Sequence, residues 1–387
     1  MMDFKGVRVL LLDGFCRQNA ILLKEMRKLG CVVTTLNDSK LDVGYASKYP
    51  KHKLLDKRFK NDLQYYEELI VSLAQSGAYD VIFPVVEEST EIVARRAEEL
   101  KSYVKIIAPP LEAFQKAHDK QLTMKICMEN GINCPKTKMD DETLEEYLQT
   151  VEFPLALKPR QGRGSVGFKK VNNKEELDKL IEDGTVVVEE YVIQEFIDEA
   201  ETHRVSYTFI DDNDEVKSSL ISKSTRPYPL GIGTNSLFES VDMPDIAEQA
   251  ERLLLLMGWR GYASVCFIES EKDGIPKVME INGRISASFK VSCLAGLNIV
   301  QQLLERAFGE QVTPAPEKLD YGRRVSHSQS GVMWFLKSPQ RFRKEPSTTG
   351  KKGKKDIVFS WSDPWPYVTY TLQCLKKYKK EMKKRQR

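Results

Sequence analysis

The sequence predicts a parallel, doubly wound α/β domain at the N-terminus, an α+β body after it, and a basic C-terminal extension. Strand-like and helix-like segments alternate over residues 1–110, short strands mix with helices over residues 111–310, and positive charge gathers near the C-terminus. The chain has 387 residues, more than one hydrophobic core usually serves. Two or three domains are therefore expected.

The N-terminal domain is predicted from repeated βα units. Short apolar runs are followed by segments with helical apolar spacing, and units of this kind form a Rossmann-like parallel sheet. The expected elements are strand Val7–Leu12, helix Arg17–Leu29, strand Cys31–Leu36, strand Val81–Val86, helix Glu88–Leu100 and strand Val104–Ala108. The Pro109-Pro110 pair is expected to end this domain.

Ligands of such sheets lie beyond the carboxyl ends of the strands, here near Asp13–Cys16 and Glu87–Ser89. No G-x-G-x-x-G motif occurs there, which disfavours a dinucleotide site. Glu87 and Glu88 are better interpreted as acids in the first turn of a helix, where they face its positive dipole end. The sequence therefore assigns no dinucleotide site to this domain.

Residues 111–310 are predicted to form an α+β body, because helical and strand-like patterns mix without regular alternation. Its first part, about residues 111–195, contains a glycine-rich loop. The expected elements are helices over Leu111–Asn130, Asp140–Leu148 and Asn173–Ile181, and β-rich runs over Val186–Phe196 and Thr202–Ile210.

The segment Phe153–Lys170 has the pattern of a hairpin that covers phosphate groups. An apolar strand carrying Lys158 runs into a loop with three glycines before the chain returns. Glycines let backbone N–H groups approach phosphate oxygens, and the lysine supplies a positive charge. A plain glycine turn is the competing interpretation. Lys120, early in a predicted helix, would by itself be only a solvated lysine.

The segment Val186–Thr202 has the pattern of a strand followed by an acidic turn. An adenine ring needs an apolar slot with one backbone carbonyl and one N–H two residues apart, which Glu195, Phe196 and Ile197 can offer. Glu201 could accept hydrogen bonds from ribose hydroxyls, although an exposed surface acid is the commoner role of such a residue. A nucleoside site is therefore one of two interpretations of this segment.

The segment Lys277–Phe289 carries oxygen-bearing side chains on one face of a predicted strand. Glu280 and Asn282 alternate with apolar neighbours, so their side chains share a face. Such ligands suit a hard cation beside a triphosphate, and the guanidinium of Arg284 can bind a carboxylate or an acyl phosphate in bidentate fashion. Because an E-x-N triplet often occurs by chance, this segment indicates a metal site only in combination with the other segments.

Taken in order, these segments resemble the ATP-grasp superfamily over about residues 111–310, and residues 1–110 resemble its usual preceding α/β domain. Within this superfamily the segments resemble the carbamoyl-phosphate synthetase large subunit and D-alanine:D-alanine ligase. The resemblance implies an ATP-grasp fold of two α+β subdomains, with residues 311–387 as a C-terminal extension. It also implies ATP and Mg²⁺ as cofactors, with Mn²⁺ as an alternative metal.

The resemblance assigns a role to each matching residue. The lysines and loop residues would bind the ATP phosphates, the hinge of Glu195, Phe196 and Ile197 would bind adenine, and an acidic residue would bind ribose. In chain order these ATP-binding residues are Lys120, Lys158, Gly162, Gly164, Ser165, Glu195, Phe196, Ile197 and Glu201. Glu280 and Asn282 would bind magnesium. Arg284 would support the acyl phosphate, and Lys223 and Arg226 would face phosphate or substrate from a loop that varies among relatives.

The implied activity is an ATP-dependent carboxylate-amine ligase reaction through an acyl phosphate, with the glycine loop excluding water. One position departs from the family pattern. Cys266 stands where relatives commonly carry an acidic or amide metal ligand, and soft sulfur is a poor ligand for magnesium. The alternative is therefore a nucleotide-binding regulatory or scaffold protein with weak or lost catalysis.

Charged residues are distributed unevenly along the chain. Residues 323–387 hold 18 Lys and Arg against four Asp and Glu, whereas residues 1–322 hold 41 against 52. Three interpretations of the basic extension remain open: a solvated helix packed on the body by its aromatic side chains, attachment to an anionic membrane surface and, least favoured, nucleic-acid binding.

The composition favours a cytoplasmic protein. No signal-peptide pattern or long apolar stretch is found, and the seven cysteines lack metal-site or redox spacing. The expected location is therefore cytoplasmic, peripheral to a membrane if the basic extension binds one. Small-molecule carboxylate and amine substrates are the expected partners, and a homo-oligomer is left open.

Overall fold

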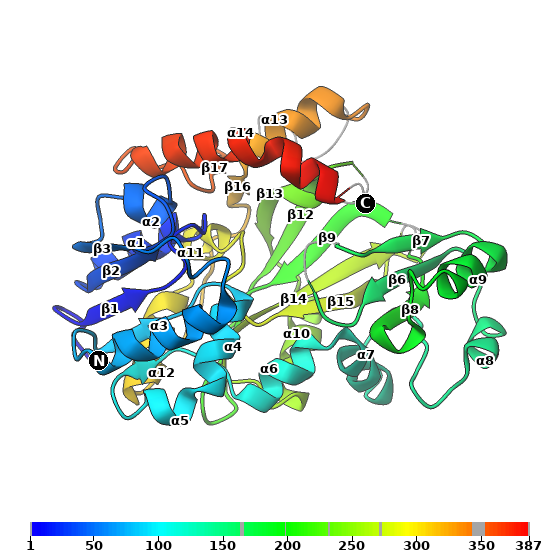
Figure 1. Ribbon diagram of the computed structural model, residues 1–387, viewed down its shortest axis with the longest axis horizontal. Helices are drawn as coiled ribbons and strands as arrows, with labels where there is room; N and C mark the ends of the chain where they lie inside the picture. Colours follow the sequence, from blue (N-terminus) through cyan, green and yellow to red (C-terminus); the bar gives the residue numbers. More distant parts are fainter. Residues whose placement is uncertain are drawn as a thin grey trace.

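The computed structural model describes residues 2–162, 166–197, 199–230, 233–270, 273–342 and 353–385. Within these ranges the chain forms three sheets with helices packed around them (Figure 1). A parallel sheet lies at one end, a small antiparallel sheet at the other, and a long, mainly antiparallel sheet between them. The predicted combination of α/β and α+β architecture is confirmed.

The N-terminal sheet has the strand order β3-β2-β1-β4-β5, and all its neighbouring strands are parallel. Its elements are β1 (Arg8–Leu11), α1 (Asn19–Lys28), β2 (Val32–Asn37), α2 (Val43–Ala46), β3 (His52–Leu55), α3 (Leu63–Gln75), β4 (Val81–Phe83), α4 (Glu87–Arg95), α5 (Ala97–Leu100) and β5 (Lys105–Ile106). Alternate residues of β1 face opposite sides of the sheet. Val9 and Leu11 pack with α1, whereas Leu10 packs with α3 and α4.

A helix pair and the small sheet follow. Helices α6 (Leu111–His118) and α7 (Lys120–Glu129) meet at Asp119, whose side chain caps α7 by accepting hydrogen bonds from its first N–H groups. The small sheet has the order β7-β6-β8, with antiparallel neighbours. The elements of this part are α8 (Leu144–Leu148), β6 (Leu155–Pro159), β7 (Lys169–Val171), α9 (Lys174–Glu182), the 3₁₀ helix η1 (Val188–Glu190) and β8 (Tyr191–Glu195).

The central sheet has the order β11-β10-β14-β9-β12-β13-β16-β17, and β15 pairs with β14. Its pairs are antiparallel except for β16 and β17. The elements are β9 (Glu199–Ser206), β10 (Thr208–Ile210), β11 (Val216–Ser218), β12 (Ile221–Tyr228), β13 (Thr234–Val241), α10 (Pro244–Leu256), β14 (Gly261–Ser270), β15 (Pro276–Asn282), α11 (Lys290–Ala295), α12 (Ile299–Phe308), β16 (Arg324–Ser326) and β17 (Lys355–Asp356).

The C-terminal helices cross one edge of the molecule (Figure 1). Helix α13 (Ser328–Lys337) packs on β12 and β13, and α14 (Trp365–Arg385) packs on α2. The Gln373 side chain of α14 donates to the Asp42 carboxylate at 2.7 Å, and Ser47 donates to the Asp363 carboxylate at 2.6 Å. Helix α14 is thus fixed to the N-terminal sheet. None of the helices in the described ranges combines the length and apolar character that a membrane crossing requires.

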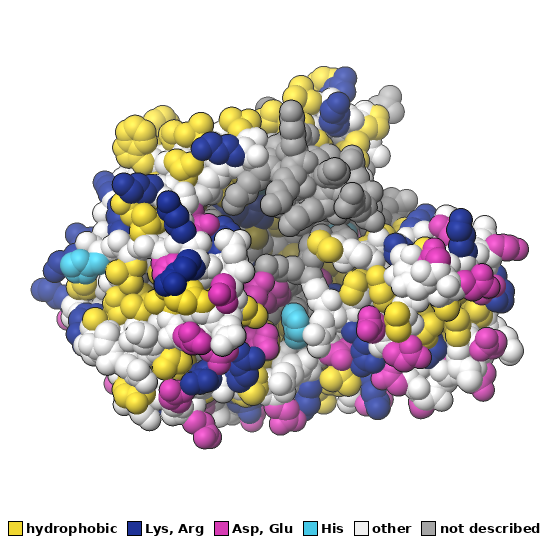
Figure 2. Space-filling model, viewed as in Figure 1, with side chains coloured by type: hydrophobic (Ala, Val, Ile, Leu, Met, Phe, Trp, Pro, Cys, Tyr) yellow, Lys and Arg dark blue, Asp and Glu magenta, His cyan; other side chains and the backbone are white. Residues whose placement is uncertain are grey.

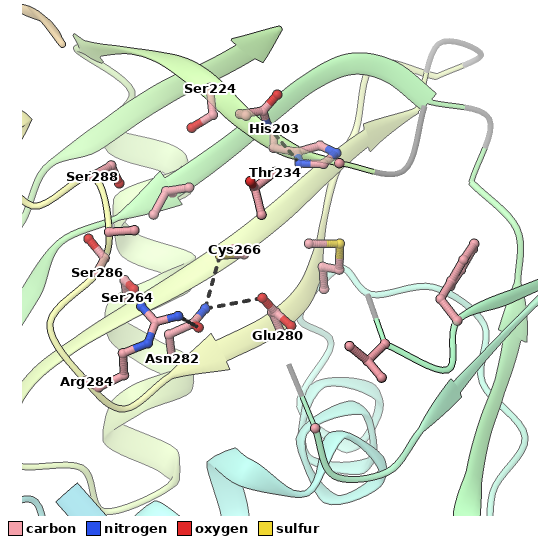
Figure 3. Close-up of a pocket in the computed structure, with 18 of the residues that line it drawn as sticks. His203, Ser224, Thr234, Ser264, Cys266, Glu280, Asn282, Arg284, Ser286 and Ser288 are labelled. Atoms are coloured by element: carbon pink, nitrogen blue, oxygen red, sulfur yellow. Dashed lines mark hydrogen bonds between the residues drawn. The ribbon is translucent and has the colours of Figure 1, made fainter. Parts of the chain in front are cut away.

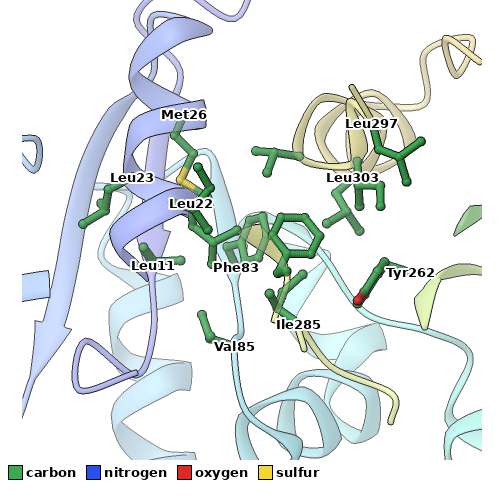
Figure 4. Close-up of a cluster of buried hydrophobic side chains, with 14 of the residues drawn as sticks. Leu11, Leu22, Leu23, Met26, Phe83, Val85, Tyr262, Ile285, Leu297 and Leu303 are labelled. Atoms are coloured by element: carbon green, nitrogen blue, oxygen red, sulfur yellow. The ribbon is translucent and has the colours of Figure 1, made fainter. Parts of the chain in front are cut away.

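One hydrophobic core connects the N-terminal sheet with the central sheet (Figure 4). Leu22 of α1 and Phe83 of β4 belong to this cluster. From the other side it contains Tyr262 of β14, Ile285 of the loop after β15, and Leu303 of α12. The pocket described below is bordered by elements on both sides of this core.

Several elements differ in extent from the sequence prediction. The predicted helix Leu111–Asn130 is divided at Asp119, whose extended backbone ends α6 and begins α7. The helix predicted over Asp140–Leu148 is confined to α8, because Thr143 and Glu146 form a capping box that begins it. The strand β3 and helix α3 were not predicted. The domain boundaries near residues 110 and 310 stay predictions.

Asp13 is fully buried beyond the end of β1 and joins three elements. Its carboxylate accepts hydrogen bonds from the Tyr66 hydroxyl at 2.7 Å, the Ser89 hydroxyl at 2.6 Å and the Val85 N–H at 3.1 Å. Its φ of 57° lies in the left-handed region, which Asp tolerates better than most residues. Asp13 therefore fixes the carboxyl ends of β1 and β4 relative to α3.

Replacing Asp13 with Ala should lower the free energy of unfolding by about 3 kcal/mol or more, because several buried donors lose their acceptor. Urea unfolding followed by circular dichroism measures the change. The control is Asp3→Ala, because Asp3 lies on the exposed N-terminal segment and accepts only a local hydrogen bond from the Lys5 N–H. Equal unfolding midpoints for the two variants would contradict the role of Asp13.

Candidate functional site

A pocket of about 270 Å³ opens between the central sheet, the small sheet and the N-terminal sheet. Strands β9, β12, β13, β14 and β15, together with the loop after β15, supply most of its wall, and the β6–β7 hairpin borders it on another side (Figure 3). The loop after β1 contributes Arg17. The site is therefore assembled from segments far apart in the sequence.

Two lysines and the glycine loop form a cationic side of this pocket. Lys158 lies on β6 and Lys120 begins α7, and both line the cavity. The Lys120 ammonium donates to the Gly162 carbonyl oxygen at 2.8 Å, which joins the helix start to the loop. Gly167 has a φ of 78°, and a Cβ there would lie 2.7 Å from Pro159, so this turn requires glycine.

The two predicted metal ligands lie on β15 beside Cys266 of β14. The Asn282 amide donates to the Glu280 carboxylate at 3.3 Å and to the Cys266 sulfur at 3.4 Å. Burial raises the pKa of the Cys266 thiol, which therefore stays protonated. In the described ranges, no group of three His, Cys, Asp or Glu side chains could hold a metal ion. Glu280 and Asn282 both line the pocket, and their role as metal ligands stays a prediction.

Arg284 connects β15 with the N-terminal sheet. Its guanidinium donates to the Asn282 Oδ1 atom at 2.7 Å, and the Glu87 carboxylate of α4 lies 4.0 Å from its Nε atom. Gln18 donates to the Ile285 carbonyl oxygen at 3.1 Å. These contacts hold the loop after β15 near the carboxyl ends of β1 and β4, between which the strand order of the parallel sheet reverses.

Another part of the wall is polar and uncharged. The Asn235 amide nitrogen lies 3.1 Å from the Nδ1 atom of His203, so this ring nitrogen accepts a hydrogen bond. Burial lowers the pKa of His203 to about 4, which leaves the ring neutral near pH 7. The Ser224 hydroxyl lines the pocket and has no hydrogen-bond partner among the described residues. A ligand would meet hydrogen-bonding groups here rather than charge.

Part of the predicted adenine hinge already forms hydrogen bonds within the protein. The Glu195 and Phe196 N–H groups donate to backbone carbonyls, and the Glu195 carboxylate accepts from the Lys277 ammonium at 3.0 Å. The Ile197 N–H has no backbone partner among the described residues. The role of Ile197 in binding a base stays a prediction.

A family model for the ATP-grasp domain matches residues 117–288, the span that contains both lysines, the glycine loop, β14 and β15. The chain contains an ATP-grasp domain. Among curated proteins, the D-alanine–D-alanine ligase A of Bacillus cereus is 32% identical in an alignment of 181 residues that covers 42% of this chain and 56% of that protein. The chain thus matches little more than half the length of this relative.

Solved structures share the fold of this ATP-grasp protein more extensively. The biotin carboxylase of Campylobacter jejuni, in complex with β,γ-ATP, has a TM-score of 0.68 at 18% identity, over 82% of this chain and 74% of that one. The L-amino acid ligase of Bacillus licheniformis has a TM-score of 0.60 at 18% identity, over 80% and 78%. At such identities these similarities show the common fold.

The ATP-grasp pocket brings together six of the residues chosen from the sequence: Lys120, Lys158, Gly162, Glu280, Asn282 and Arg284. The hinge residues are not part of its lining. The predicted contacts of Gly164 and Ser165, and the side chain of Glu201, lie outside the described residues. The roles assigned to all these residues stay predictions.

Lys223 and Arg226 do not line the ATP-grasp pocket. Lys223 precedes the pocket-lining Ser224 on β12, and successive side chains of a strand point to opposite faces. Arg226 has a φ of 66° where the β12–β13 register is interrupted, and its guanidinium lies 4.9 Å from the Trp334 ring centre. Both predicted substrate-facing cations therefore lie outside the lining of this pocket, and their role stays a prediction.

Three residues of the site were not selected from the sequence. Arg17 lies one position beyond the predicted ligand region Asp13–Cys16. Its place just after the first strand could therefore have identified it from the sequence. Glu87 was interpreted as a first-turn acid, which it is, but it also faces Arg284. His203 had no local signal, because its role follows from neighbours on other strands.

Replacing His203 with Gln should remove part of the pH dependence of stability. The pKa of His203 is about 4 in the folded chain and 6.5 when unperturbed, so between these values the unfolded state binds the proton and the folded state does not. As pH falls from 6.5 to 4, the wild-type chain should therefore lose up to about 3 kcal/mol more stability than His203→Gln.

Urea unfolding at a series of pH values measures this difference. The control is His52→Gln, because His52 is exposed on β3. The same pH dependence in wild type and His203→Gln would show that His203 is not kept neutral by the fold.

Proposed function

We propose that this protein is an ATP-dependent ligase that activates a carboxylate as an acyl phosphate and transfers the acyl group to an amine or a similar nucleophile. The observation that carries the proposal is that two lysines, two arginines, one glutamate and one asparagine of β15 line a single pocket. The names of its relatives, a D-alanine–D-alanine ligase and an L-amino acid ligase, support the same reaction class.

Phosphate binding would fall to Lys120 and Lys158. Their ammonium groups reach the pocket from α7 and β6, beside the glycine loop. They would neutralise ATP phosphate charge as the γ-phosphoryl group moves, which lowers the barrier to transfer. The Ile197 N–H would bind the adenine edge.

The donor atoms of Glu280 and Asn282 fit a magnesium site. Mg²⁺ prefers hard oxygen ligands and commonly uses one or two protein ligands together with phosphates and waters, and Mn²⁺ accepts the same ligands. A bound ion would supply charge stabilisation for phosphoryl transfer. The Asn282 amide nitrogen faces Glu280 and its Oδ1 atom accepts from Arg284, so binding of one metal ion by both side chains would require the Asn282 amide to turn.

The reaction would proceed in two displacements. A carboxylate oxygen of the substrate attacks the γ-phosphorus of ATP, ADP leaves, and an acyl phosphate forms. The amine nitrogen then attacks the acyl carbon, inorganic phosphate leaves, and the surplus proton of the amine passes to phosphate or solvent. Arg284 would bind the acyl phosphate, and the β6–β7 hairpin would exclude water.

The alternative is a nucleotide-binding regulatory or scaffold protein with weak or lost catalysis. The observation that favours it is the protonated thiol of Cys266, which replaces a metal ligand with a group that does not bind Mg²⁺ well. Release of ADP and phosphate, measured with Mg²⁺ against panels of carboxylates and amines, separates the two functions. ATP binding without substrate-stimulated turnover would favour the alternative.

Glu280→Gln should reduce kcat by about 100-fold, because the amide keeps the shape of the side chain but removes the charge that would hold the metal. Coupled assays of ADP release across a range of Mg²⁺ concentrations measure kcat and the apparent metal affinity. The control Glu248→Gln removes an exposed acid on α10 and should leave both unchanged. Full activity of Glu280→Gln would refute the metal assignment.

Arg17→Gln should raise the KM of one carboxylate-bearing substrate by about tenfold or more, with little effect on the KM of ATP. Arg17 lines the pocket from the N-terminal sheet, away from β6 and α7, which carry the phosphate-binding lysines. Steady-state kinetics with each substrate varied in turn measures the change in KM for each substrate separately. The neighbouring exposed Arg27→Gln on α1 is the control. An equal rise in both KM values would argue against a substrate-specific role.

A further inference from the structure

Helices α13 and α14 carry an exposed apolar surface on one edge of the molecule. Among the described residues, 20 large apolar side chains are exposed, and nine of them lie between residues 332 and 375. They are Val332, Phe335, Leu336, Phe342, Trp361, Trp365, Val368, Leu372 and Leu375, here called the α13–α14 surface. Figure 2 shows hydrophobic side chains over the start of α14 and over α13, with basic side chains among them. Such a concentration indicates an interaction surface.

The residues of α14 form a regular stripe. Trp365, Val368, Leu372 and Leu375 follow one another at intervals of three or four residues, which places them on one face of the helix. Trp365 is 65% exposed and Leu375 is 69% exposed. Trp361, just before the helix, is 90% exposed. The stripe faces solvent along the described part of the helix.

The opposite face of α14 is already bound to the protein. Tyr367 and Tyr370 pack on the main core, Gln373 is hydrogen-bonded to Asp42, and the Thr371 hydroxyl accepts from Gln329 of α13 at 2.8 Å. These contacts fix the rotation of the helix about its axis. The apolar stripe therefore stays on the face of α14 that points away from the described part of the chain.

The charge beside this surface is strongly positive. Residues 361–387 contain eight Lys and Arg against two Asp and Glu, and all eight follow the apolar stripe. Lys376, the first of them, is exposed. At the other end of the stripe the exposed Lys48 donates its backbone N–H to Asp363 at 3.3 Å. An apolar stripe with basic residues at its ends complements an apolar layer bordered by negative charge.

We propose that the α13–α14 surface docks on an anionic membrane surface, with its apolar side chains in the interface and its basic residues at lipid phosphate and carboxylate groups. An amphipathic helix of this composition lies parallel to a bilayer, because aromatic side chains favour the interface and lysines favour anionic lipids. The docking does not depend on the proposed ligase reaction, since none of these residues lines the pocket. The competing occupant is a second copy of the chain.

The experiment is flotation of the full-length protein with vesicles of phosphatidylcholine alone and of phosphatidylcholine with phosphatidylserine. Binding should be at least tenfold stronger to the anionic vesicles and should weaken as salt is raised. The same sample without vesicles is examined by analytical ultracentrifugation to determine its oligomeric state.

A triple variant tests the apolar part. Trp365→Ala, Leu372→Ala and Leu375→Ala together should reduce vesicle binding by about tenfold or more, because apolar insertion is lost. The matched control replaces three exposed apolar residues elsewhere, Leu63→Ala, Met128→Ala and Val187→Ala, and should bind as the wild type does. Circular dichroism and thermal unfolding confirm that both variants are folded.

A charge variant tests the basic part. Lys376→Gln with Lys377→Gln should weaken binding to anionic vesicles by several-fold, whereas Lys125→Gln with Lys174→Gln removes the same charge elsewhere and should not. The proposal is overturned if the wild type shows no preference for anionic vesicles, or if the apolar triple variant binds as well as the wild type. If the wild type does not bind vesicles and the triple variant has a different oligomeric state from the wild type, the surface would be assigned to contact with a second copy of the chain.

Discussion

The pocket depends on the hydrophobic core shared by the N-terminal sheet and the ATP-grasp domain. Leu22 and Phe83 on one side and Ile285 and Leu303 on the other lie in the same buried cluster. A fully buried side chain of this size contributes about 2 kcal/mol of stability. Because protein cores are closely packed, the two parts cannot shift past each other without losing these contacts. The loop after β15 therefore has a fixed position against the ends of β1 and β4.

Polar contacts build the site on this core. Ile285 is buried in the cluster, and its carbonyl oxygen accepts from Gln18, while the adjacent Arg284 lies between Asn282 and Glu87. A guanidinium has donors on several edges, so it can interact with two acidic or amide groups and still face the cavity. The orientation of Asn282, and with it the proposed metal site, is thus linked to the N-terminal sheet.

The C-terminal extension folds on the body in spite of its charge because a few specific contacts hold it. The buried ammonium of Lys290, at the start of α11, donates to the Phe359 carbonyl oxygen at 3.0 Å, and burial lowers its pKa to about 8. Ile357 and Val358 join the shared core. The basic residues of α14 come after these anchors, so their mutual repulsion does not act on the packed segment.

The sequence by itself determined the order of the elements and the local placement of chemistry. Lys158 before the glycines, and Glu280 and Asn282 on one strand, follow from patterns within a few residues, because strand periodicity relates close neighbours. Only the tertiary structure decided that Arg17 and Glu87 face the same loop and that Arg226 packs on Trp334. Those contacts join residues far apart in the chain, and shared packing, which no local pattern records, brings them together.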